Sequence, residues 1–261
     1  MTHFHVTLPS DNSRDYYPDN TSSRYTIKLP ERVKLDGDYE VGLSEFIYSH
    51  TWFNFNNEAE TFWFGIKIGE EDITKFQFKS GYYQDGAALA TDLNRQASRS
   101  LLDMANVRIR FIFNNSSNKF SIETSNRGWL IISNELMKHL GFLKGWPVNP
   151  GLKMTATSMF TMNRGMNLIY IYSDVASYSI VGDIETPLLR VCNTSGRDSE
   201  MVRTIFTHPH YVPVARNEFE TIEINIKDEL GRRIPFMHGK SIVTLHFRPR
   251  YHESLLRHAA V

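Results

Sequence analysis

Two histidine pairs are the first candidates for chemistry in this sequence. His3 and His5 are separated by one residue, and so are His208 and His210. On a β-strand this spacing places both imidazoles on one face, and neutral imidazoles are good zinc ligands. Neither pair has a third ligand at a metal-like spacing. We therefore expect surface or interface histidines and no bound metal.

A phosphate-binding loop and a reactive thiol are the next possibilities. Gly239-Lys240-Ser241 resembles the end of such a loop, but the motif needs a glycine five residues before Gly239, and that position is Ile234. Cys192 closes the apolar run that begins at Leu188, where a thiol packs inertly. We expect neither a nucleotide site nor a nucleophilic cysteine.

Acidic pairs offer no better case for catalysis. Glu70-Glu71 and Asp228-Glu229 lie in predicted turns, where carboxylates solvate a loop rather than share a proton across a cleft. We therefore expect that the chain is not an enzyme and takes no cofactor and no small-molecule substrate. A hydrolase or transferase site in the middle of the chain is the alternative, which would require a deep pocket with convergent polar groups.

Composition narrows the possible partners and compartments. The 261 residues carry 29 Lys plus Arg and 29 Asp plus Glu, so no net field attracts nucleic acid or an anionic membrane. We expect no specific nucleic-acid partner. Because no run of about 18 apolar residues occurs, we also expect no membrane span. A single cysteine and an N-terminus without signal-peptide features predict synthesis in the cytosol.

Short strands bounded by turn residues are predicted at both ends of the chain. The aromatic content of 13% favours sheet, and Ile222, Ile224 and Ile226 alternate with polar residues, which predicts one packed face. Three strands at the start and five at the end make eight, the number expected of an antiparallel jelly-roll sandwich. The expected strands are Phe4–Leu8, Tyr25–Leu29, Tyr39–Tyr48, Leu168–Tyr172, Leu188–Cys192, Val202–Phe206, Thr221–Ile226 and Ile242–Phe247.

The middle of the chain is predicted to be an inserted α+β region. Residues 85–104 carry apolar side chains at four-residue spacing, which predicts an amphipathic helix opened by Asp85. A hairpin of Val107–Phe113 with Lys119–Thr124 follows, and then a short helix that ends at Gly141. The expected organisation is a jelly-roll domain of residues 1–57 plus 166–250, an α+β insertion domain of residues 58–165 and a C-terminal tail of residues 251–261.

Aromatic and arginine side chains are candidate anchors of a protein–protein interface. The candidates are Trp52, Phe53 and Phe55 in one cluster, and Arg197 and Arg203 in a polar stretch. The alternative for the aromatic cluster is a place in the hydrophobic core. The alternative for the arginines is an ordinary exposed loop.

Short motifs in a fixed order run along nearly the whole chain. In that order they resemble the Polinton/Maverick (adintovirus-like) minor capsid (penton) proteins. The motifs are Phe4–Ser10, Tyr17–Thr21, Tyr25–Ile27, Tyr39–Glu45, Gly81–Tyr83, Leu93-Asn94, Phe113-Asn114, Leu140–Phe142, Gly182-Asp183, Pro187–Leu189, Tyr211–Val214, Phe219, Ile222–Lys227, Gly231, Pro235-Phe236, Gly239-Lys240 and Leu245–Arg248.

This resemblance implies a mainly β structural protein with a single jelly roll. It implies a homopentamer at the vertices of an icosahedral capsid, beside a separate double-jelly-roll major capsid protein, and therefore a location in the virion. The alternative function is a non-viral carbohydrate- or ligand-binding β-sandwich, in which aromatics such as Trp129 and Trp146 would stack on sugars.

Overall fold

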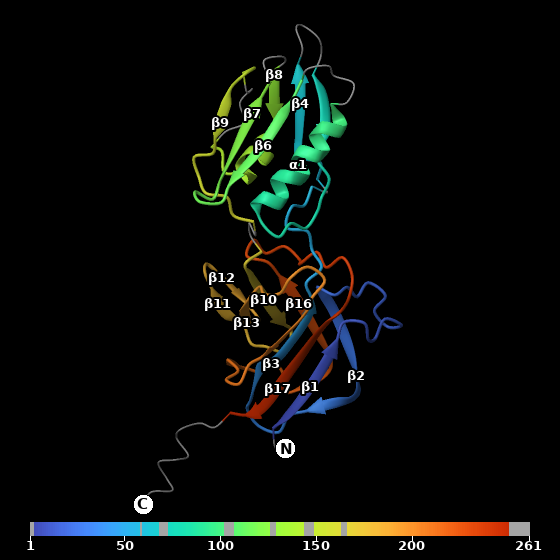
Figure 1. Cartoon of the computed structure of the whole chain (residues 1–261). Helices are drawn as coiled ribbons and strands as arrows, with labels where there is room; N and C mark the ends of the chain where they lie inside the picture. Colours follow the sequence, from blue (N-terminus) through green and yellow to red (C-terminus); the bar gives the residue numbers. More distant parts are fainter. Residues whose placement is uncertain are drawn as a thin grey trace, which may run out of the picture. The chain divides into compact units, whose positions relative to one another are not determined.

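The computed structural model divides the chain into two compact units. The first unit is Met1–Trp52 with Gly165–Val261, and the second unit is Phe53–Arg164. The structure describes residues 3–57, 59–67, 73–101, 107–125, 129–143, 149–162 and 166–250 (Figure 1). The predicted tail of residues 251–261 and Trp146 lie outside these ranges. The predicted boundaries of independently folding domains stay predictions.

The first unit contains a sheet built from the two ends of the chain. Its strand order is β1 (Phe4–Pro9), β17 (Ser241–Pro249), β3 (Tyr39–Ser49) and β14 (Met201–Ile205), and all pairs are antiparallel. A short strand, β15 (Tyr211–Pro213), pairs with β3 near its start. We call this the first sheet.

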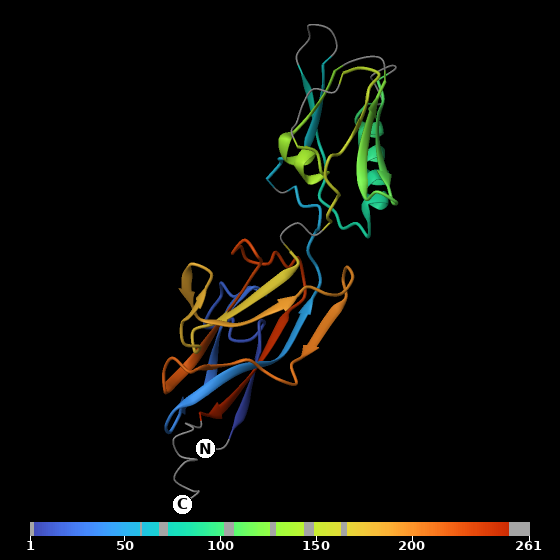
Figure 2. The same cartoon turned by 90° about the vertical axis from the view of Figure 1, so that its left-hand side faces the viewer.

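A second sheet has the order β13 (Leu188–Asn193), β10 (Leu168–Ser173), β16 (Glu218–Lys227) and β2 (Arg24–Lys34), again antiparallel. Between β10 and β13 the chain forms a hairpin of β11 (Ser179–Val181) and β12 (Ile184–Thr186). Figures 1 and 2 show this hairpin beside the two sheets rather than within them.

The strands pair from the outside of the chain inward. In chain order, the strands on the two main sheet paths are β1, β2, β3, β10, β13, β14, β16 and β17. The first pairs with the last, the second with the seventh, the third with the sixth and the fourth with the fifth. The strands of the first unit therefore form one long hairpin, and its two arms are folded into two sheets.

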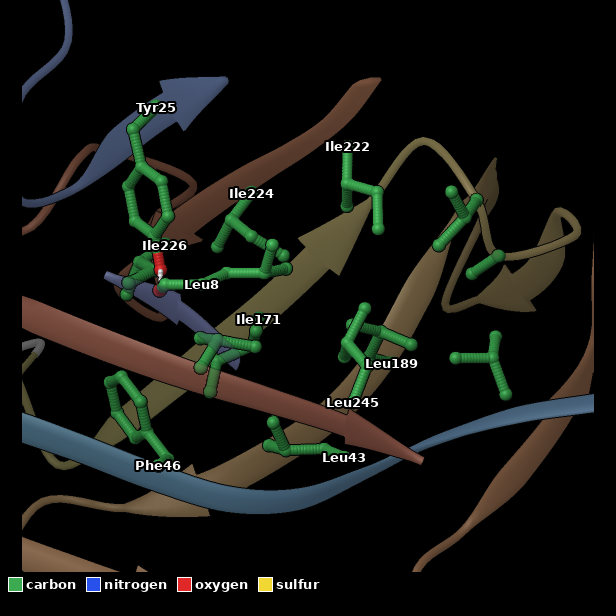
Figure 3. Close-up of a cluster of buried hydrophobic side chains, with 14 of the residues drawn as sticks. Leu8, Tyr25, Leu43, Phe46, Ile171, Leu189, Ile222, Ile224, Ile226 and Leu245 are labelled. Atoms are coloured by element: carbon green, nitrogen blue, oxygen red, sulfur yellow. Dashed lines mark hydrogen bonds between the residues drawn. The ribbon is translucent and has the colours of Figure 1, made fainter. Parts of the chain in front are cut away.

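The core of the first unit lies between the inward faces of these sheets. The predicted alternation in β16 is confirmed, because Ile222, Ile224 and Ile226 are fully buried. They pack in one cluster with side chains of the first sheet such as Leu43 and Leu245 (Figure 3). Along β16 the period of two thus buries one face and leaves Glu223, Asn225 and Lys227 on the other face only partly buried.

A buried hydrogen bond joins the two sheets inside this core. The Tyr25 hydroxyl of β2 donates to the Leu8 carbonyl of β1 at 3.1 Å (Figure 3). Burial raises the pKa of Tyr25, so this hydroxyl keeps its proton at any physiological pH. A phenol in an apolar core needs a partner, and the carbonyl supplies it.

The second unit is α+β. The helix α1 (Gly86–Ser100) begins as predicted, with the Asp85 carboxylate accepting from the Ala88 N–H at 2.7 Å. Two sheets accompany it, with the orders β5 (Thr74–Gln77), β4 (Trp63–Lys67), β8 (Trp129–Ile132) and β6 (Ile109–Asn114), β7 (Lys119–Thr124), β9 (Lys153–Thr155). The pairing of β6 with β7 confirms the predicted hairpin.

The second helix, α2 (Asn134–His139), confirms the predicted glycine stop. Gly141 has a φ of +92°, and the Phe142 N–H donates to the Met137 carbonyl at 2.9 Å. A hydrogen bond of this kind ends a helix when the residue after the C-cap has a positive φ, a conformation that favours glycine. In the described part of the chain, no helix is long and apolar enough to cross a membrane.

The expected strand Tyr25–Leu29 ends just before Pro30, and this boundary is wrong. β2 continues from Arg24 to Lys34, and its pairing with β16 shifts register between Phe219 and Thr221. Residues 29–32 have no register partner on β16, and β2 is the edge strand of its sheet, so a residue without an N–H removes no ladder hydrogen bond there. The short strands β8, β9, β11, β12 and β15 were not predicted.

We predict that Ile224→Ala lowers the free energy of unfolding by about 2–5 kcal/mol, because it leaves a cavity in the closed core. Urea unfolding followed by circular dichroism measures this loss. Ile180→Ala, at a side chain that is 78% exposed, is the matched control and should change stability by less than about 0.5 kcal/mol. Equal effects of the two changes would contradict the assignment of the core.

Candidate interaction surface

The two predicted arginine anchors lie on one surface of the first unit. Arg197 and Arg203 both line a depression of about 620 Å³ formed by the β13–β14 loop and β14. Both residues are exposed. The other lining residues are Ser195, Gly196, Glu200, Met201 and Val202. We call this set of residues the β14 surface.

The loop that carries Arg197 is tied to the end of β3. The Tyr48 hydroxyl donates to the Ser195 carbonyl and accepts from the Ser195 N–H, both at 3.0 Å. Burial raises the pKa of Tyr48, which keeps this two-way bond in place. Backbone bonds from His50 to Glu200 and from Ser199 to His50, each 2.8 Å, hold the rest of the loop.

Gly196 is required where this loop turns. Its φ is +93°, and a Cβ built there would lie 2.4 Å from Cγ2 of Val202. Both the backbone conformation and the close approach to β14 therefore exclude a side chain. The glycine brings the Arg197 backbone N–H to within 2.7 Å of a Glu200 carboxylate oxygen.

The outward face of β14 alternates apolar and basic side chains. Met201 and Ile205 are both more than half exposed, and Arg203 lies between them on the same face. The Arg203 guanidinium pairs with Glu45 of β3 at 2.5 Å. β14 is also the last strand on its sheet path. Exposed Met and Arg on an edge strand are typical of protein contact surfaces.

The predicted aromatic anchors lie elsewhere. Trp52 is 2% exposed and packs against the rings of Tyr48 and Phe236 in the first unit. Phe55 is fully buried in the core of the second unit, and Phe53 is partly exposed. In the single chain, Trp52 and Phe55 thus lie in hydrophobic cores, which was the alternative considered for the aromatic cluster.

The β11–β12 hairpin is a second exposed surface, which sequence reasoning did not single out. Tyr178, Ile180 and Ile184 are 70%, 78% and 58% exposed. Gly182 in its turn has a φ of +65°. A two-stranded hairpin is marginally stable in water by itself, and apolar side chains exposed on it favour contact with a partner.

Among the described residues that were considered for enzyme chemistry, none form a catalytic arrangement; Glu70 and Glu71 lie outside the described ranges. Cys192 is buried in β13, and burial raises the pKa of its thiol to about 11. Within the described ranges, no group of three or more His, Cys, Asp or Glu side chains is arranged so that it could hold a metal ion. Gly239 turns with a φ of +84° against Ser49, and the strand β17 follows it where a phosphate-binding loop would lead into a helix.

A second depression, of about 650 Å³, lies in the second unit beside Tyr83 and Asp92. The Asp92 carboxylate accepts hydrogen bonds from Tyr83, Arg95 and Gln96. Burial opposes its ionisation, but these three donors outweigh burial and lower the pKa of Asp92. The carboxylate is saturated by its own neighbours and is not poised as a general base. Trp129, considered for sugar stacking, is 46% exposed in the same unit.

Comparison with known proteins identifies the fold. No family profile matches the sequence, and no curated protein matches it either. Among solved structures, the mavirus penton protein is similar with a TM-score of 0.52 and 14% identity, covering 95% of this chain and 98% of that chain. A chain of the Sputnik virophage structure gives a TM-score of 0.50 and 11% identity, covering 98% and 99%. The chain therefore has a penton-like fold, mainly β with antiparallel sheets.

We predict that Cys192 reacts with iodoacetamide at pH 8 at least about a hundredfold more slowly in the folded chain than in urea. The thiolate is the reactive species, and a pKa of about 11 leaves very little of it at that pH. Mass spectrometry of the alkylated chain over time measures both rates. Equal rates would contradict the burial of this thiol.

Proposed function

We propose that this chain is a minor capsid (penton) protein of a Polinton/Maverick-type element and forms homopentamers at the vertices of an icosahedral capsid. The observation that carries the proposal is the likeness to the mavirus penton protein over 95% of this chain and 98% of that one. The likeness thus extends over the sandwich and the inserted region together. The order of motifs in the sequence supports the same assignment.

A single jelly roll is part of this proposal. The outside-in pairing of β1 with β17, β2 with β16, β3 with β14 and β10 with β13 supports it. A jelly roll is a double-sheet sandwich of eight strands, and four strands lie on the main path of each sheet here. One such sandwich fits a minor capsid role beside a separate double-jelly-roll major capsid protein.

Closure into a ring sets a requirement on the surface. A cyclic assembly larger than a dimer uses a heterologous contact, so two different patches of one chain must fit each other. The β14 surface and the β11–β12 hairpin are two exposed patches with apolar and Arg side chains. We propose that they take part in contacts with a second copy or with the major capsid protein. The chain would be made in the cytosol and end in the virion.

We predict that the purified chain associates into a species of five times its mass of 30.3 kDa. Mass photometry over a range of concentrations measures the distribution of species. A strict monomer at every concentration would contradict self-assembly of this chain alone.

We predict that Ile180→Asp and Arg203→Glu each weaken this association at least about tenfold, since charge or repulsion at a central contact costs about 2 kcal/mol. Leu230→Asp, which places the same charge at an exposed apolar residue between β16 and β17, is the matched control. If both variants associate as the unchanged chain does, these patches are not part of the contact between copies. That result would not contradict the proposal of a pentamer.

A further inference from the structure

Three histidines meet on the outward face of the first sheet, although two of them are at one end of the sequence and the third is near the other. His5 of β1 is opposite His246 of β17, and their rings stack with centroids 4.4 Å apart. His3 meets His246 edge-on, with its Nδ1 3.2 Å from Nε2. We call His3, His5 and His246 the histidine row.

A tyrosine completes the row from the far side of β3. The Tyr211 hydroxyl of β15 lies 2.7 Å from Nδ1 of His246. Gly42 is the residue of β3 opposite both His246 and Tyr211, so no side chain stands between them. A Cβ at Gly42 would lie 3.1 Å from Cδ1 of Tyr211 and 3.0 Å from the His210 carbonyl. The glycine lets the tyrosine reach across the strand.

Both ring nitrogens of His246 are thus engaged, one by His3, the residue before β1, and one by Tyr211 of β15. The inner face of β1 is held differently, because Phe4 stacks on Phe247 with centroids 5.0 Å apart. β1 is the edge strand of its sheet, and β17 is its partner there (Figure 1). The histidine row therefore adds side-chain contacts on the outward face to the backbone pairing of β1 with β17.

Among the described residues, no carboxylate forms an ion pair or hydrogen bond with a histidine of the row. Arg248 of β17 lies over the Tyr211 ring at 3.5 Å and pairs with Glu40 of β3 at 2.5 Å. Farther along β3, Glu45 is paired with Arg203. Glu40 and Glu45 on this face are thus each paired with an arginine and with none of the three histidines.

Adding protons therefore brings like charges into contact. His3 and His5 are exposed to solvent, so a proton added to either ring lies next to His246 and near Arg248. Burial, then the neighbouring His5, His3 and Arg248, lower the pKa of His246 in the folded chain. The unfolded chain thus binds more protons as the pH falls below about 6.5, so the stability of this contact decreases with acidification.

We propose that protonation of the histidine row releases the start of β1 from β17, which makes the N-terminal strand a proton-sensitive clasp on the first sheet. The clasp responds to the binding of protons and needs no other ligand. This property belongs to the single chain and does not depend on pentamer formation or on any capsid role.

Hydrogen exchange of the full-length chain tests the clasp. Exchange is measured by mass spectrometry at pH 7.5 and pH 5.5 in the presence of EDTA, which removes metal ions, and each rate is corrected for the intrinsic effect of pH. We expect the protection of residues 3–9 to fall about fivefold or more at pH 5.5, the effect of one pair of like charges about 4 Å apart in water. Residues 222–226 serve as the core reference and should keep their protection.

His246→Gln is the decisive variant, because an amide can bond Tyr211 and His3 but cannot be protonated. We expect its protection at residues 3–9 to be the same at both pH values. The double variant His3→Gln/His5→Gln leaves His246 and Arg248 in place and removes the two histidines beside His246, so it serves if His246→Gln fails to fold. Its pH response should be smaller than that of the unchanged chain.

His238→Gln is the matched control, since this exposed histidine lies in the connection between β16 and β17 and outside the row. It should respond to pH as the unchanged chain does. Two results would overturn the proposal: protection at residues 3–9 that does not change with pH in the unchanged chain, or the same loss in the glutamine variants of the row.

Discussion

The pairing of the first strand with the last is the constraint on which the rest of the first unit depends. β1 and β17 join in continuous register from Phe4↔Phe247 to Pro9↔Ile242. Once they are joined, each inner pair of strands is brought toward its partner, and the two sheets can close on the isoleucines of β16. The Tyr25–Leu8 hydrogen bond then links the sheets at the same end of the chain.

Much of this arrangement could be predicted from residue patterns, because local spacing reports which face of a strand or helix is buried. The isoleucines of β16, the Asp85 cap and the Gly141 stop are such cases. The end of the strand before Pro30 was predicted wrongly, because a proline interrupts a strand only where its missing N–H would be needed. The sequence does not tell an edge strand from a central one.

The surfaces were harder to predict. Arg197 and Arg203 are near each other in sequence, and the structure brings them together on one surface. The exposure of Ile180 could not be foreseen, because β11 has the same apolar character as a buried strand and only tertiary packing decides its fate. His3 and His246 are 243 positions apart, so their contact follows from the register of β1 on β17 and from nothing local.

Because the first strand pairs with the last, the two units fold at different times while the chain is synthesised. The first sheet cannot close until β17, at residues Ser241–Pro249, has left the ribosome. The second unit is one continuous segment, Phe53–Arg164, and all the partners of its core are made before β10 begins. Because contacts between distant segments form slowly, the inserted unit should be folded while β1, β2 and β3 still await their partners. For most of translation the apolar faces of those three strands are unpaired, which makes the nascent chain a substrate for chaperones.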